Sequence, residues 1–153
     1  MAVPNTLAIM LQMQVYLVAT TLYTNVVIGA QKDWTEACPI AEVMIIDDKS
    51  EHFALGGQIR DTQGFRVTTG VSFTTQTPLA AVTQLCAIRD VIIPTFQQHA
   101  YLGGMVQGVQ DSRIRPSTNR ISFLKMDSGD YLIHECIVEV ESVYSVPIGA
   151  QGI

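Results

Sequence analysis

The sequence contains few charged residues. Only 15% of its 153 residues are charged, and 14 Asp and Glu against 9 Lys and Arg give a net charge of −5. Proteins that grip DNA or RNA normally carry a basic surface, because contacts to phosphate dominate their affinity. The acidic balance therefore argues against stable nucleic-acid binding, although an acidic surface is compatible with DNA passing by without sticking.

Cysteine is scarce as well. The three cysteines, Cys38, Cys86 and Cys136, are odd in number and widely spaced, whereas a secreted disulfide framework usually has an even set in a shorter chain. We interpret them as reduced, mostly buried thiols that behave as small hydrophobic side chains. This interpretation fits assembly in a cytoplasm.

Basic residues are missing from the N-terminal part of the chain. The first of them is Lys32, and a secretory signal needs a positive region ahead of its apolar core. Polar residues interrupt the apolar stretch over 7–22, and about 20 apolar residues in a row are needed to cross a bilayer. We therefore expect neither a signal peptide nor a membrane span in this stretch.

Known catalytic motifs are also missing. Gly56-Gly57 and Gly103-Gly104 lack the surrounding residues of a phosphate-binding glycine loop. The G-x-S-x-G elbow of serine hydrolases does not occur either. The sequence therefore predicts a protein that is not an enzyme and that holds no cofactor.

Side chains that could ligate a metal or act as a nucleophile are few and dispersed. His134 and Cys136 stand side by side on a predicted strand, where they do not converge as a nucleophile pair would. We interpret His134 as a half-buried sheet residue and Cys136 as a core thiol. The acidic pairs at 47–48 and 127–130 are expected in turns, where carboxylates usually bond the local backbone. No metal site is predicted.

Apolar residues, by contrast, are abundant at 48%, and their spacing predicts helices and strands. Thr77 followed by Pro78 is a favoured helix start, and Asn5 and Thr6 are candidate caps of an earlier helix. From Phe65 onward apolar and polar residues alternate, which places one face of a strand on the helices and leaves the other polar. The expected elements are helices over 7–23 and 79–96, and strands over 25–28, 40–47, 65–74, 105–110, 120–126 and 131–146.

The segments between these elements carry the signals of loops and breaks. Pro94 is expected to kink or end the second helix, and residues 48–57, 111–119 and 127–130 are expected to form loops or turns. Runs of strands interrupted by two helices, without parallel βαβ units, predict an α+β fold with two helices packed on a mainly antiparallel sheet. We expect one domain over 1–153, with a loose tail over 147–153.

The first predicted helix is apolar on nearly all sides. Leu7, Leu11 and Leu17 lie on one broad side, and Ile9 and Val15 extend the apolar surface around the helix. A helix of this kind is buried on more than one side. It is either the central helix of the core, or it turns a second side towards a neighbouring subunit.

Arginines are concentrated in one stretch, at Arg113, Arg115 and Arg120. They form either a solvated loop or a docking loop, because arginine makes bidentate contacts with carboxylates and is enriched at interfaces. The acidic row of the last strand is the natural complement on a neighbouring copy, at a ring interface or on the wall of a lumen. Such a head-to-tail contact is heterologous and makes a ring where its rotation closes. The row consists of Glu135, Glu139 and Glu141.

The order of the predicted helices and strands, and the kinds of residue in them, give further information. An N-terminal helix is followed by the segment Pro39-Ile40-Ala41-Glu42-Val43, a strand over 65–71, a helix over 79–96 and a final hairpin over 121–146. Over most of the chain this arrangement resembles the tail-terminator and related neck proteins of long-tailed bacteriophages. The family offers no catalytic or ligand motif, so no residue role is carried over. The first helix is more apolar than the resemblance implies, which leaves open a deeper contact with another neck protein.

The resemblance implies a structural virion protein that forms a ring, expected to be a hexamer, at the end of the tail tube. Such a ring would stop polymerisation of the tube protein and dock the tail to the head connector or head-closure protein. Its lumen would let DNA pass without specific binding, and it would assemble in the host cytoplasm with no membrane involved. The alternatives are another neck or tail-tube component, a small-ligand-binding or enzymatic α+β domain with its pocket near His134 and Cys136, and a cellular adaptor that dimerises through the first helix.

Overall fold

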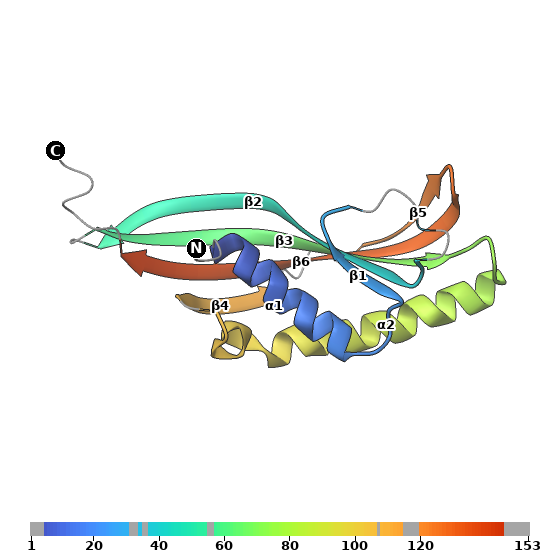
Figure 1. Ribbon diagram of the computed structural model, residues 1–153, viewed down its shortest axis with the longest axis horizontal. Coiled ribbons are helices and arrows are strands. Elements are labelled where there is room, and N and C mark those ends of the chain that lie inside the picture. The colour runs from blue at the N-terminus through green and yellow to red at the C-terminus, as the bar shows by residue number, and fades with distance from the viewer. Residues whose placement is uncertain are drawn as a thin grey trace.

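Two helices lie on one face of a six-stranded sheet (Figure 1). The structure is a computed structural model that describes residues 5–30, 34, 37–54, 57–106, 108–114 and 120–145. The fold is α+β, with a mainly antiparallel sheet, as the sequence predicts. Its elements are the helices α1 (Asn5–Ala19) and α2 (Pro78–Gln98), the short 3-10 helix η1 (Ala100–Gly104), and the strands β1 (Asn25–Ile28), β2 (Ile40–Ala54), β3 (Gln58–Ser72), β4 (Val109–Ile114), β5 (Arg120–Met126) and β6 (Gly129–Ser145).

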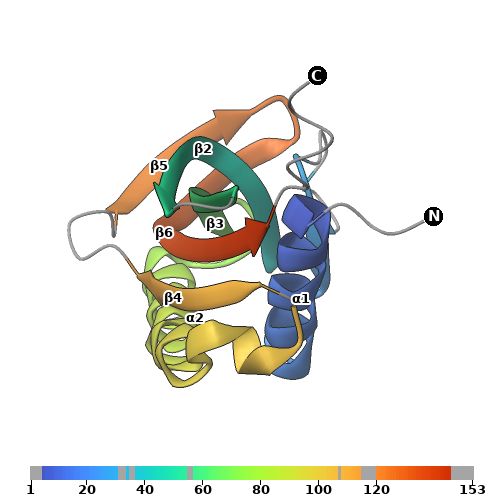
Figure 2. The ribbon, with the colours of Figure 1, turned by 90° about the vertical axis from the view of Figure 1, so that its left-hand side faces the viewer.

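The strands follow the order β1-β2-β3-β6-β4, and β5 also pairs with β6. Because β3 occupies one side of β6, strands β5 and β4 share its other side, β5 along the first half and β4 along the second. Figure 2 looks along the sheet from one end and shows α1 on the side of β1 and α2 on the opposite side. The sheet therefore has two distinct flanks, one formed by α1, β1 and β2 and the other by α2, β4 and β5.

The pair β1–β2 is parallel, unlike the other pairs in the sheet. The Thr24 N–H donates to the carbonyl of Pro39 and the Gly29 N–H to the carbonyl of Val43, both at 2.8 Å. The sequence predicts β1 at these residues but does not identify its parallel partner. No tight turn links the two strands, and it is a tight turn that fixes register locally.

The β2–β3 hairpin is longer than the sequence predicts. Residues 48–54, expected in a loop, continue β2. Cross-strand pairs accompany these polar residues: Ser50 Oγ donates to Asp61 Oδ1, and Arg60 Nη1 lies 3.9 Å from Glu51 Oε1. Figure 1 shows the hairpin projecting past both helices. Because no helix covers this end, polar residues are tolerated on both faces of the strands.

The expected capping residues of α1 bind the sheet instead. Gln63 Nε2 on β3 donates to Thr6 Oγ1 at 2.8 Å, and Asn5 Nδ2 lies 3.5 Å from Ser142 Oγ on β6. Both residues are part of the helix, which begins at Asn5. Their hydrogen bonds fix the N-terminal end of α1 over the two central strands.

α1 ends at Ala19 rather than at the predicted residue 23. Thr21 takes a φ of 60°, in the left-handed region that a helix cannot continue through. After this reversal the phenol oxygen of Tyr23 lies 2.8 Å from Thr69 Oγ1 on β3. The polar pair sits in the core, and burial raises the pKa of Tyr23 above its usual range.

α2 begins where the sequence predicts, with Thr77 as its N-cap. Of the two outcomes expected at Pro94, a kink or the end of the helix, the second does not occur, because α2 continues to Gln98. The carbonyl that Pro94 leaves without a helical partner is that of Asp90, which lies on the exposed side where water can bind it. Ile92 and Phe96, on either side of Pro94 in the sequence, are both buried in the core.

We predict that Thr77→Ala lowers the free energy of unfolding by about 1 kcal/mol. Thr77 Oγ1 accepts a hydrogen bond from the Ala80 N–H at 3.2 Å, and the alanine variant leaves that donor to water. Thr83→Ala is the matched control, since Thr83 is an exposed threonine of the same helix whose hydroxyl donates to the Leu79 carbonyl. Urea unfolding followed by circular dichroism should show a loss for Thr77→Ala only. Equal losses would contradict the capping role.

β4 lies further along the chain than expected. The sequence predicts a strand over 105–110 and a loop over 111–119, whereas β4 spans Val109–Ile114. Arg113 is therefore in a strand and not in a loop. β5 matches the predicted 120–126. Gly129, the first residue of β6 after the Asp127-Ser128 turn, has a φ of 145°, which glycine adopts readily. The expected tail over 147–153 lies outside the described residues.

The core lies between the helices and the sheet. Alternate residues of β3 and β6 point into it, as the period of two in the sequence predicts. The buried side chains of α2 recur at helical spacing against the same face of the sheet. The fully buried side chains of this core include Phe65, Val67, Val71, Cys136, Val138 and Val140 from the sheet and Ile9, Met13, Leu17, Ala81 and Ile92 from the helices.

A second, smaller cluster covers part of the opposite face of the sheet. Trp34, from the connection between β1 and β2, lies directly over Gly70 of β3. Tyr131 and Ile133 of β6 are buried in the same cluster. The sequence predicts a polar face here, and it does not predict that the indole ring covers this face around Gly70.

Candidate assembly surfaces

The acidic row of β6 lies on the face of the sheet that points away from the helices. Val138 and Val140 face the core, so the alternation of the strand turns Glu139 and Glu141 to the other side. Glu135 lies on that same side, and all three glutamates are half-buried. The structure thus places the three predicted residues in one row on the outer face.

Basic residues of the same chain stand opposite each of these glutamates. Arg120 on β5 is the register partner of Glu135, and Arg113 on β4 is the register partner of Glu139. The third glutamate, Glu141, lies 3.4 Å from Arg60 Nε. The complement that the sequence assigns to a neighbouring copy is therefore available within one chain. Arg115, the remaining arginine of that stretch, lies outside the described residues.

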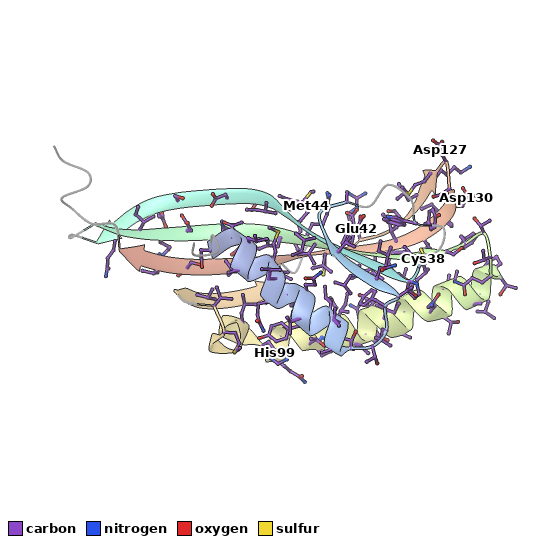
Figure 3. The ribbon with its side chains drawn as sticks, in the orientation of Figure 1. Cys38, Glu42, Met44, His99, Asp127 and Asp130 are labelled. Atoms are coloured by element: carbon purple, nitrogen blue, oxygen red, sulfur yellow. The ribbon has the colours of Figure 1, made fainter. Side chains whose placement is uncertain are left out.

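The outer face is a patchwork of both charges. Figure 3 shows Glu42 on this face, on the side of the sheet away from the helices. Exposed ion pairs contribute little to stability, typically below about 1 kcal/mol each. This face therefore resembles the polar rim of an interface more than its apolar centre. Two rows cross the sheet here: Glu42, Thr68, Glu135 and Arg120, and further along Asp47, Gly64, Glu139 and Arg113.

His134 lies in the core and is only 1% exposed, rather than half-buried as predicted. Neither of its ring nitrogens has a hydrogen-bond partner. Burial, together with the positive charge of Arg89 on α2, lowers the pKa of His134 to about 4. The imidazole is therefore neutral at physiological pH.

Cys136 is a core thiol, as predicted. Burial raises its pKa to about 12, so the thiol stays protonated at neutral pH, and the protonated form is not the nucleophile. His134 and Cys136 share a face of β6 two residues apart and do not converge. Among the described residues no group of three or more His, Cys, Asp or Glu side chains could hold a metal ion.

The three cysteines are free, as the sequence predicts. Their burial differs from the prediction, because Cys38 is only half-buried and Cys86 is exposed on α2. Burial nevertheless raises the pKa of Cys38 to about 11. Neither Cys38 nor Cys136 has the lowered pKa of a reactive thiol.

The two acidic pairs do not come together. Asp47 and Asp48 lie within β2, next to a bulge, and not in a turn. Asp127 and Asp130 lie at the tip of the β5–β6 hairpin (Figure 3). There the Asp130 backbone N–H donates to the side-chain Oγ1 of the distant Thr74 at 3.0 Å, which is not the local bond between a carboxylate and the backbone that the sequence predicts.

α1 has one side in the core and a second apolar side that the single chain leaves uncovered. Ile9, Met13 and Leu17 are fully buried against the sheet. On the outer side, Val15 is 56% and Val18 is 57% exposed. No charged residue occurs between positions 1 and 31, so the helix carries no charged side chain. The outer stripe consists of Leu7, Leu11, Val15 and Val18.

Large apolar side chains are also exposed on the opposite flank. Ile121 and Phe123 on β5 are 58% and 65% exposed. Their register partners on β6, His134 and Leu132, face the core, so both side chains are on the helix side of the sheet. The Phe123 ring meets Phe73 edge-on, with 5.1 Å between centroids. On α2, Leu79 and Val82 are exposed as well.

By length and composition alone, α2 could cross a membrane. The core helix of a soluble protein passes the same test, and Leu85, Ile88 and Phe96 of α2 are buried in the core. The adjacent charges of Arg89 and Asp90, 3.1 Å apart, lie at the middle of the helix. The packing of α2 therefore accounts for part of its apolar character, while Leu79, Val82 and Val91 remain exposed.

No protein-family model matches this chain, and no curated protein matches it.

Proposed function

We propose that this chain is a structural virion protein, a ring-forming tail terminator of a long-tailed bacteriophage. It would end the tail tube and join the tail to the head connector, leaving a channel for DNA. Its partners would be further copies of itself, the tail tube protein and the connector or head-closure protein. The proposal begins from the resemblance in element order, which the α+β architecture with two helices on one face supports.

The observation that carries the proposal is the outer stripe of α1. Val15 and Val18 are more than half exposed on a helix whose other side is fully buried. An apolar patch left open on a single chain marks a surface that a partner covers. Burying the exposed part of one such side chain contributes roughly 1 kcal/mol. A structural protein that acts by binding other subunits would use this stripe as a contact surface.

The charge of the chain supports the same function. A channel for DNA must let the polyanion move, and a net charge of −5 disfavours adhesion to phosphate. The residues that could have supplied chemistry, His134 and Cys136, are buried and in unreactive forms.

The mass of the protein in solution tests this proposal. We expect native mass spectrometry to find a ring of about six copies, or a monomer that assembles into one when purified tail tubes lacking their terminator are added. A monomer that is indifferent to tubes would contradict the proposal and direct attention to ligands of the region around His134. A stable dimer would favour the adaptor alternative.

A further inference from the structure

We propose that neighbouring copies in the ring bind head-to-tail through the two opposite flanks of the sheet. The outer stripe of α1, with the free edge of β2 beside it, would contact the flank formed by β5 and α2 of the next copy. This inference rests on the proposed function, since it names the surfaces that would join the subunits of that ring. The occupant of each apolar surface is thus a second copy of this chain.

The two apolar surfaces lie on opposite sides of the molecule. Figure 2 shows α1 on one flank and β5 and α2 on the other. A single copy therefore cannot satisfy one surface with the other. Two different surfaces on opposite flanks form a heterologous contact, which leaves one free surface at each end of any open chain of subunits. Ring closure removes both free surfaces.

Each surface offers apolar side chains of matching character. Val15 and Val18 of α1 would meet Ile121 and Phe123 of β5, and these four are each more than half exposed. The aromatic ring of Phe123 is already held in place by Phe73, so little side-chain freedom is lost when it is covered. A preordered aromatic side chain at the centre of a contact is typical of the residues that dominate binding energy.

The charges of the two flanks are complementary. The exposed charged residues of β2 are Asp47, Asp48 and Glu51 against Lys49, whereas those of β5 are Arg120 and Lys125. Beyond Val43, no strand among the described residues pairs with the outer edge of β2, where Asp48, Lys49 and Glu51 are exposed.

This charge pattern selects between two arrangements. A two-fold contact would place β2 against β2, or β5 against β5, and would bring like charges together. A head-to-tail contact brings the acidic edge to the basic one. The pattern therefore favours a ring over a symmetric dimer.

Two exposed substitutions test the pairing. Val15→Asp places a charge in the α1 stripe, and Phe123→Asp places one in the β5 surface. Since both side chains are largely exposed, we expect circular dichroism of the monomers to stay unchanged. Under conditions in which the wild-type chain assembles, each variant should lower the assembled fraction at least tenfold. Met105→Asp, at an exposed apolar position outside both surfaces, is the matched control and should assemble normally.

Mixing the two variants separates a head-to-tail contact from other arrangements. Val15→Asp retains an intact β5 surface and Phe123→Asp retains an intact α1 stripe. An equimolar mixture should therefore form a two-copy complex, one of each variant, and no ring. If Val15→Asp abolishes assembly and Phe123→Asp does not, α1 packs on α1 or on another protein, and the proposed pairing is wrong.

The outcomes also separate this inference from the function on which it rests. Rings of normal mass from both variants would overturn the interface and leave the tail-terminator proposal in place. Mixtures that stay monomeric, although each variant alone fails to assemble, would overturn the head-to-tail pairing only. A wild-type chain that stays monomeric at every concentration and with tail tubes would overturn both.

Discussion

Trp34→Ala is expected to lower the free energy of unfolding by about 3–5 kcal/mol, the usual cost of truncating a buried tryptophan. The indole is only 2% exposed and forms the centre of the cluster on the outer face of the sheet. Its ring meets Tyr131 edge-on at 5.1 Å, and its Nε1–H donates to Glu42 Oε2 at 3.3 Å. Urea unfolding followed by circular dichroism measures the loss, since the substitution removes the only tryptophan.

Gly70→Ala should also lower the free energy of unfolding, because the Trp34 ring packs directly on Gly70. A Cβ at this position would lie 2.3 Å from Trp34 Cζ3 and 2.8 Å from Cε3, so the ring would have to move. In the Trp34→Ala background this collision is gone, and Gly70→Ala should then cost little. The two substitutions are therefore expected to couple strongly in a double-mutant cycle. Equal effects of Gly70→Ala in both backgrounds would refute the contact.

Acid is expected to destabilise the protein through His134. The pKa of this side chain is about 4 in the folded state against 6.5 for an unperturbed histidine. Between these values the unfolded chain binds a proton that the folded chain does not, so stability falls as the pH falls. The stability is complete above pH 6.5, and about 3 kcal/mol is lost once the pH has reached 4. At pH 5 the loss should be about 2 kcal/mol.

His134→Leu should remove this part of the acid sensitivity. The substitution deletes two buried nitrogens that have no hydrogen-bond partner, so stability at pH 7 should be equal to or greater than that of the wild type. Unfolding free energies at pH 7, 6 and 5 should diverge between the two proteins as the pH falls. His99→Leu is the control and should retain the wild-type loss, because His134 is still present. Parallel curves for His134→Leu and the wild type would contradict the assignment.

Local patterns in the sequence predict much of the fold. The Thr77 cap, the alternation along β3 and β6, and the bounds of β1 and β5 all depend on residues near one another in the chain. Part of the charged outer face could also be predicted from the sequence. The turn at Asp127-Ser128 fixes the register of the last hairpin, and that register pairs Arg120 with Glu135.

Other features depend on contacts between distant residues. Arg113 pairs with Glu139 across a connection whose length sets no register. The polar end of β2 reads as a loop until β3 is placed beside it and supplies partners such as Arg60 for Glu51. The exposed side of α1 also depends partly on the local sequence and partly on distant contacts. Composition predicts that the helix is apolar all round, but only the packing of Ile9 and Met13 on the sheet decides which side stays exposed.

The sequence by itself therefore determined the α+β class, the order of its elements and the lack of charge on the first helix. The tertiary structure decided which faces are covered. Trp34 closes the outer face over Gly70, and the two apolar flanks remain open on opposite sides. The physical reason is that helical and strand periodicity follow from local backbone geometry, whereas burial depends on which distant segments the folded chain brings together.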